Sequence, residues 1–224
     1  MLSLDSAALI ASDEAATKIS EAVVASGEIS VEAWIAPDNL TQRGPARIVT
    51  LSSDSLNRNV TLGQDRDEFQ VRLRTTTTGT NGVGRTVGSS SDAVTTDLSH
   101  VVYTRDASGD AHLYVDGVLV ASETIDGSLA NWDESYRFGL GDELSTGRPF
   151  VGEYDLVAVY GTALTGDDVA QNFDAGPGGL EAEPEPVPTT TLAPTTTTVT
   201  PTTTTTVAPT TTPCLLYTSD AADE

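Results

Sequence analysis

The sequence predicts an all-β protein, an antiparallel sandwich or jelly roll, and three observations support this fold class. Residues 112–120, His-Leu-Tyr-Val-Asp-Gly-Val-Leu-Val, place two alternating apolar runs on either side of Asp116-Gly117. That dipeptide favours the positive φ angles of a type I′ hairpin turn. Another apolar run, at 101–105, precedes the hairpin, so three strands follow one another as a meander. About ten such short runs with frequent turns indicate a sandwich and not a parallel α/β sheet.

The predicted elements begin with a strand over residues 2–10 and a short helix over 17–25. In this helix apolar residues lie four positions apart, and Gly27 is placed to end it. Residues 29–35 alternate, so their apolar side chains share one face of a strand. The apolar runs that follow predict short strands over residues 47–51, 59–62 and 69–73.

Residues 76–94 are predicted to form a long loop rich in Gly, Ser and Thr. After the meander, strands are predicted over 136–140 and 154–160. A last helix starts after Thr165, which is a capping residue followed by acidic residues in the first turn, and it ends before Gly176.

A single globular domain is predicted over residues 1–176, followed by a tail of different composition. Residues 177–213 are rich in Pro and Thr and lack aromatic side chains. We expect them to form a disordered, semi-stiff linker, because they bury too little apolar surface to offset the entropy of ordering. Thr/Pro-rich stalks of this kind are often extracellular and O-glycosylated.

Residues 214–224 break with this composition and match the translation of a sequencing adapter, so we exclude them from fold reasoning as non-native sequence. Without Cys214, the only cysteine, the chain offers no disulfide or thiolate. The start of the chain lacks the features of a signal peptide, and we expect the sequence to be a fragment of a longer protein.

The charge of the chain excludes two classes of partner. It has 33 acidic and 11 basic residues and a net charge of −22. Such a surface repels phosphate backbones and anionic lipids, so we expect no nucleic-acid binding. No apolar run approaches the length of a membrane span, so we expect no membrane insertion. The ordinary interpretation of the acidic residues is a surface that keeps the protein soluble. The more specific interpretation is that some of their carboxylates coordinate Ca²⁺.

Five blocks of sequence, in the family's order, resemble the strands of laminin-G-like, concanavalin A-like jelly-roll domains. They are Val31–Ile35, His100–Arg105, Leu113–Gly117, Tyr136–Gly141 and Gly152–Tyr160. The resemblance covers nearly all of residues 1–176 and implies two antiparallel sheets that pack on each other. It also implies an extracellular or cell-surface module that binds carbohydrate or protein, in many members with Ca²⁺ at the sheet edge. The family is diverse, so the fold does not settle the function.

Asp5 and Asp155 are the candidate calcium ligands. Both are expected on terminal strands, which are usually neighbours in this fold, and together with backbone carbonyls they would ligate one Ca²⁺. The alternative is that both are strand-end carboxylates satisfied by backbone N–H groups.

Trp132, Arg72 and Arg74 are the candidate ligand-binding residues. Trp132 lies in a predicted loop, where its flat face would either stack on a sugar ring or pack in the core. Arg72 and Arg74 alternate with apolar residues and would project from one sheet face. With Arg47 and Arg58 they would form a basic patch for an acidic glycan; solvated sheet-face arginines are the alternative.

The sequence predicts no catalytic activity. A retaining glycoside hydrolase needs two carboxyl groups about 5 Å apart. In hydrolases of this fold group, both are carried on one strand. The nearest match has Glu153 and Asp155, but apolar residues stand where the second Glu is needed. We therefore predict a non-catalytic extracellular binding module for carbohydrate recognition or adhesion. The alternative is a structural protein–protein interaction module of a larger surface protein, and a glycoside hydrolase ranks third.

Overall fold

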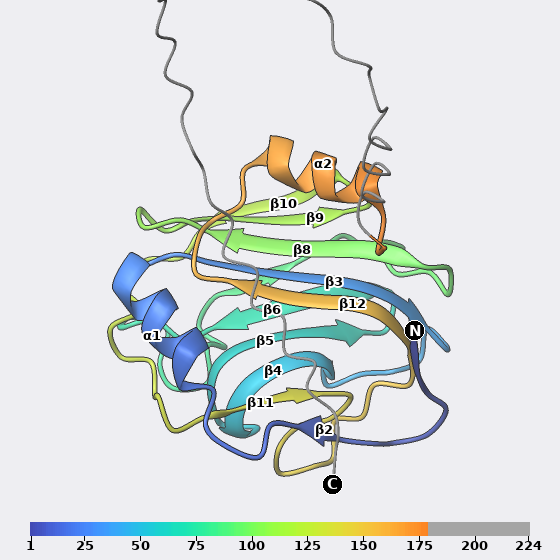
Figure 1. Ribbon diagram of the computed structural model, residues 1–224, viewed down its shortest axis with the longest axis horizontal. Coiled ribbons are helices and arrows are strands. Elements are labelled where there is room, and N and C mark those ends of the chain that lie inside the picture. Colours follow the sequence, from blue (N-terminus) through green and yellow to red (C-terminus); the bar gives the residue numbers. More distant parts are fainter. Residues whose placement is uncertain (179–224) are drawn as a thin grey trace, which may run out of the picture. The chain divides into compact units, whose positions relative to one another are not determined.

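The computed structural model describes residues 1–178 and confirms the predicted fold class (Figure 1). Two antiparallel six-stranded sheets pack face to face, and two short helices flank them. Sheet A has the strand order β1-β12-β3-β8-β9-β10, and sheet B has the order β2-β11-β4-β5-β6-β7. The predicted linker beyond residue 178 and the segment 214–224 lie outside the described residues.

The strands of sheet A are β1 (Leu2–Leu4), β12 (Gly152–Tyr160), β3 (Ile29–Pro37), β8 (Ser99–Arg105), β9 (Asp110–Val115) and β10 (Val118–Thr124). Those of sheet B are β2 (Ile10–Ala11), β11 (Arg137–Leu140), β4 (Ala46–Asp54), β5 (Asn57–Asp65), β6 (Glu68–Leu73) and β7 (Thr86–Gly88). Each sheet therefore joins segments from both ends of the domain, as β12 lies between β1 and β3 and β11 lies between β2 and β4.

Two of the predicted elements differ from the structure. Residues 2–10 do not form one strand, because β1 and β2 pair in different sheets and the chain crosses the sandwich between them. The predicted loop over 76–94 contains the three-residue strand β7, which pairs with β6 and buries Val87 in the core. A strand this short gives no detectable alternation in the sequence.

The predicted hairpin is confirmed in detail. Asp116 and Gly117 have φ angles of 50° and 75°, as a type I′ turn requires at both central positions. The strands β8, β9 and β10 follow one another in the sheet, which is the predicted meander. The side chain of Asp116 also accepts a hydrogen bond from the backbone N–H of His100 at 2.8 Å, so it acts as a turn residue.

Both predicted helices are present. In α1 (Thr17–Ser26), Gly27 ends the helix with a φ of 72°. In α2 (Gly166–Ala175), Thr165 and Asp168 cap the first turn through reciprocal hydrogen bonds. The helix α2 lies across the outer face of sheet A, where Val169 packs with Val102 and Tyr114 (Figure 1). The outer face is the face of a sheet that points away from the core.

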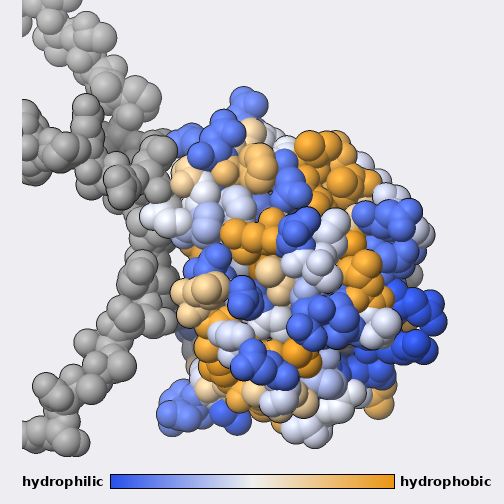
Figure 2. Space-filling view, turned by 90° about the vertical axis from the view of Figure 1, so that its right-hand side faces the viewer, coloured by the Kyte–Doolittle hydropathy of each residue, from blue (hydrophilic) through white to orange (hydrophobic). Residues whose placement is uncertain are grey.

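The hydrophobic core fills the space between the two inner sheet faces, where alternate residues of both sheets are buried. On the side of the molecule seen in Figure 2, hydrophilic and apolar residues are interspersed. Among residues 1–178, no helix has the length and apolar character that crossing a membrane requires.

The hairpin turn and α2 depend on each other through Gly117. A Cβ atom at Gly117 would lie 3.1 Å from Cδ1 of Phe173 in α2. We expect Gly117→Ala to lower the free energy of unfolding by about 1–3 kcal/mol, because it adds backbone strain and displaces Phe173. Urea denaturation measures this loss. The matched control is Gly79→Ala, at a φ of 75° with no atom within 4 Å. Equal losses in the two variants would show that the contact with Phe173 contributes nothing.

Candidate functional site

The outer face of sheet B carries a row of polar side chains that runs across three strands. Arg72 of β6 is paired with Thr61 of β5, which is paired with Thr50 of β4. Residues paired across strands point to the same face, and the alternating Val71 and Leu73 point into the core. The hydroxyl groups of Thr50 and Thr61 lie 2.9 Å apart, so they are hydrogen-bonded to each other.

Two further arginines lie on this face and are fully buried. Arg47 and Arg58 are 0% and 1% exposed. Arg47 is neutralised by Glu143, which reaches over the sheet from the loop after β11, with 2.8 Å between Nε and Oε2. Glu143 also accepts hydrogen bonds from the Ser52 hydroxyl and from the backbone N–H of Leu144. One carboxylate therefore holds the loop onto the sheet.

The arginine cluster, which we define as Arg47, Arg58, Arg72 and Arg148, carries four positive charges, against three carboxylates that act on its members: Glu143, Asp142 and Asp65. Burial, and then repulsion from Arg47, lowers the pKa of the Arg58 guanidinium to about 10. Burial and the charge of Arg47 also lower the pKa of Arg72, although its side chain is partly exposed. The shifts show that these guanidinium groups lie within electrostatic reach of one another.

Several donors of the cluster have no partner among the described residues. They are Nη2 of Arg47, Nε and Nη1 of Arg58, and Nε of Arg72. Buried donors are normally hydrogen-bonded, and an unpaired charged donor is costly. The half-buried Arg72 and Arg148 give this positive region access to solvent. The arrangement suits an anionic group such as a carboxylate, which guanidinium groups bind through paired N–H donors.

The predicted basic patch is therefore partly corrected by the structure. Arg72 takes part in the arginine cluster as expected, but Arg47 and Arg58 are buried and not displayed on the surface. Arg74 is engaged elsewhere: its Nη1 donates to the Tyr136 hydroxyl at 3.3 Å, and its guanidinium lies 5.9 Å from that ring's centroid.

Trp132 is not placed to stack on a sugar. It is 6% exposed and belongs to the core, and its indole N–H donates to the backbone carbonyl of Arg74 at 2.9 Å. The loop position suggested exposure, but this carbonyl satisfies the indole and lets the ring be buried.

The two candidate calcium ligands are not brought together. In the pairing of β1 with β12, Leu2 is opposite Tyr154 and Leu4 is opposite Gly152. Asp5 and Asp155 therefore lie at opposite ends of this pairing, about four residues or roughly 13 Å apart. Asp155 lies 3.8 Å from the N-terminal amino group instead. The pair does not fit a shared Ca²⁺ site, and calcium binding stays a prediction.

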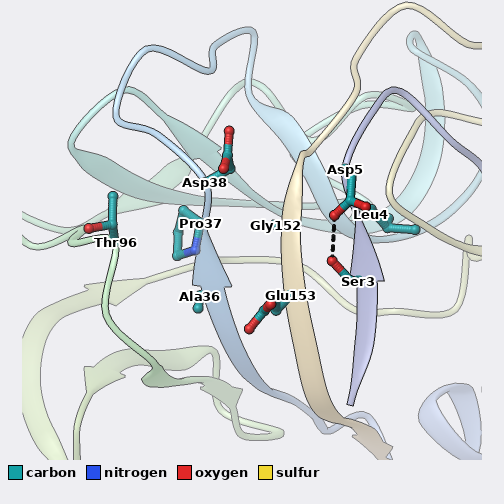
Figure 3. Close-up of a pocket in the computed structure, with 9 residues that line it drawn as sticks. All are labelled: Ser3, Leu4, Asp5, Ala36, Pro37, Asp38, Thr96, Gly152 and Glu153. Carbon is teal, nitrogen blue, oxygen red and sulfur yellow. Dashed lines mark hydrogen bonds between the residues drawn. The ribbon is translucent and has the colours of Figure 1, made fainter.

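Asp5 lines a different feature, an open hollow of about 300 Å³ at the ends of β1, β3 and β12 (Figure 3). Asp38 and Glu153 also line it, and the carboxylate of Asp5 accepts a hydrogen bond from the Ser3 hydroxyl at 2.7 Å. Within residues 1–178, no group of three or more His, Cys, Asp or Glu side chains is arranged to hold a metal ion.

Glu143 and Arg148 are the site residues that sequence reasoning missed. Both lie in the loop between β11 and β12, outside any strand pattern. Glu143 is 96 positions from Arg47, so no local signal links the two residues. The sequence does contain an Asp142-Glu143 pair near Arg148, but such a charged loop is ordinarily solvated.

Comparison with known proteins identifies the family. Residues 11–170 match the concanavalin A-like lectin/glucanases superfamily, in its laminin-G-like branch. The chain belongs to this superfamily. A search of curated proteins gave no match.

Solved structures of the superfamily fold are similar to the chain at low sequence identity. One is the Ruminococcus gnavus IT-sialidase CBM40 bound to α2,3-sialyllactose, with a TM-score of 0.58 and 14% identity over 76% of this chain and 95% of that one. Another is a structure of botulinum neurotoxin type C, whose cell entry depends on interaction with two ganglioside molecules. It has a TM-score of 0.52 and 14% identity over 75% of this chain and 39% of that one. At these identities the likeness shows the fold alone.

Proposed function

We propose that the protein is a non-catalytic carbohydrate-binding module that recognises an acidic glycan through the arginine cluster. The observation that carries this proposal is the set of unpaired guanidinium donors on the outer face of sheet B. A ligand carboxylate or sulfate binds at the partly exposed Arg72 and Arg148, and the buried charges of Arg47 and Arg58 add to its attraction. A structure of similar fold, the sialidase CBM40 bound to α2,3-sialyllactose, supports this class of ligand.

We further propose that the module works outside the cell or on the cell surface, attached through the Thr/Pro-rich segment. The composition of residues 177–213 supports this location, as such stretches commonly serve as extracellular spacers.

An array of acidic and neutral glycans, probed with the full chain, tests the function. We expect binding to sialylated, uronate or sulfated glycans, and we expect that binding to weaken as the salt concentration rises. Arg72→Ala should lower the affinity by roughly tenfold or more, because a hydrogen bond to a charged group is lost. Its thermal unfolding should stay close to that of the unchanged protein, as Arg72 is partly exposed.

The matched control is Lys18→Ala, which removes one positive charge from the exposed face of α1. It should leave glycan binding unchanged. If no acidic glycan binds, or if Lys18→Ala weakens binding as much as Arg72→Ala does, the proposal is wrong. Silence on the array together with capture of a protein partner would instead select the interaction-module alternative.

A further inference from the structure

A polar groove lies on the outer face of sheet A, on the opposite side of the sandwich from the arginine cluster. Its volume is about 230 Å³. One wall is formed by His112 and Tyr114 of β9, and the other by the segment 163–166 before α2. None of the arginine-cluster residues lines it. The groove is smaller than the roughly 300–1,000 Å³ of pockets for drug-sized ligands, so it suits a single small ring.

The walls of the groove are held by the sheet itself. Thr104 of β8 is paired with His112, and Val102 with Tyr114, so these side chains point to one face. On the neighbouring strand β3, the Ser30 hydroxyl donates to the Thr162 carbonyl at 2.8 Å and accepts from the Leu164 N–H at 2.9 Å. These two bonds fix the segment before α2 along the edge of the groove. The groove is therefore preformed.

Two hydroxyl groups that line the groove have no protein partner. Thr104 is 2% exposed and Tyr114 is 8% exposed, yet neither hydroxyl makes a hydrogen bond within residues 1–178. His112 hydrogen-bonds Ser122 through Nδ1 at 2.8 Å, which leaves Nε2 available. These three groups line the groove with free hydrogen-bonding capacity, so they can donate to or accept from the hydroxyl groups of a ligand.

The charge of the groove sets the class of ligand. Asp106 and Asp110 lie at one end, and no Lys or Arg is among the residues that line the groove. Anionic ligands are therefore disfavoured. The rings of His112 and Tyr114 meet edge to face, 6.1 Å between centroids, and give an apolar wall for the C–H face of a sugar ring. Burial raises the pKa of the Tyr114 hydroxyl, so this group remains a donor at neutral pH.

We infer that this groove is a second carbohydrate site that takes one neutral hexose ring, with Thr104, His112 and Tyr114 as its hydrogen-bonding residues. The site does not depend on the arginine cluster, and it selects neutral sugars where the arginine cluster selects acidic ones. A module with both sites binds an acidic sugar on one face and a neutral sugar on the other, so it can link two glycan chains.

The experiment is a titration of the ¹⁵N-labelled full chain with methyl glycosides of glucose, galactose and mannose, followed by amide chemical shifts. Concentrations up to about 50 mM detect dissociation constants in the millimolar range. We expect at least one sugar to shift amides of residues 104–114 and 163–166 and to leave those around the arginine cluster in place.

Thr104→Val is the decisive variant, since it replaces the unpaired Thr104 hydroxyl that lines the groove by a methyl group of similar shape. We expect it to fold normally and to weaken sugar binding by roughly two- to tenfold, the effect of one hydrogen bond. Val118→Ala, at an exposed position in β10, is the control and should bind unchanged. Arg72→Ala should also keep this binding, so the two sites can fail separately.

The inference is overturned if no neutral glycoside shifts the amides of the groove, or if Thr104→Val binds as tightly as the unchanged protein. It is also overturned if acidic glycans produce the larger shifts there.

Discussion

Glu143→Ala is expected to lower the free energy of unfolding by about 3–5 kcal/mol, the loss found when one partner of a buried ion pair is removed. Both side chains of the Arg47–Glu143 pair are 0% exposed. Without the carboxylate, the charge of Arg47 stays buried and loses its ion-pair partner. Arg58 and Arg148 add to its repulsion, because they already act on the same region. The loss is a large part of the roughly 5–15 kcal/mol that stabilises a typical domain.

Urea denaturation followed by circular dichroism measures this loss. The comparison variant is Glu143→Gln, which keeps an acceptor for Arg47 but removes the charge, and we expect it to lose less. The double variant Arg47→Met with Glu143→Leu should recover most of the stability, since apolar replacements of a buried pair are often neutral or better. A loss below about 1 kcal/mol in Glu143→Ala would show that the pair does not hold the loop on the sheet.

The second large effect is expected at Glu32, beneath α2. Its carboxylate accepts hydrogen bonds from His100 at 2.8 Å, Tyr160 at 2.6 Å and Asn172 at 3.1 Å. Trp34 and Phe173 enclose this cluster, with the Trp34 ring stacked on His100 and Phe173 at 4.7 and 5.7 Å. Glu32→Ala removes three charge-assisted bonds at once, and we expect a loss of about 3–5 kcal/mol.

The pH dependence of stability follows from the same contacts. Burial by itself raises the pKa of the Glu32 carboxyl, but the hydrogen bonds from His100, Tyr160 and Asn172 outweigh it and hold the pKa below its ordinary value of 4.5. A lowered pKa in the folded state means that the stabilisation is present above the unfolded value. It is lost as the pH falls through the folded value.

Glu32→Gln isolates this contribution from those of the other carboxyl groups, since glutamine cannot titrate. Denaturation of the two proteins at a series of pH values from 7 to about 3 gives the difference in their stabilities. We expect this difference to be constant at neutral pH and to shrink below about pH 4.5, where Glu32 becomes protonated. A difference that does not change with pH would mean that the pKa of Glu32 is the same in the folded and unfolded proteins, so the contacts with His100, Tyr160 and Asn172 would not lower it.

Local signals in the sequence determined the elements of this fold. The hairpin at Asp116-Gly117 and the capped helix after Thr165 both form as predicted, because each depends on bonds between residues a few positions apart. Alternation along 29–35 correctly placed Glu32 and Trp34 on a shared face. It could not show that α2 covers that face, since Phe173 lies far away in the chain.

The candidate site was only partly predictable. Arg72 was identified from its alternation with apolar residues, which is a property of one strand. The burial of Arg47 and Arg58 depends on which loop crosses the outer face of sheet B. Trp132 is buried because the carbonyl of Arg74, 58 positions away, satisfies its indole.

By itself, then, the sequence determined the all-β sandwich, its meander and its two helices. Only the tertiary structure decided which side chains meet at the candidate sites. Strand register separates Asp5 from Asp155, and packing between distant segments brings Glu143 to Arg47 and the segment 163–166 beside Thr104. The physical reason is that periodicity and turn chemistry act over a few residues, whereas register and loop packing are settled by contacts between segments far apart in the chain.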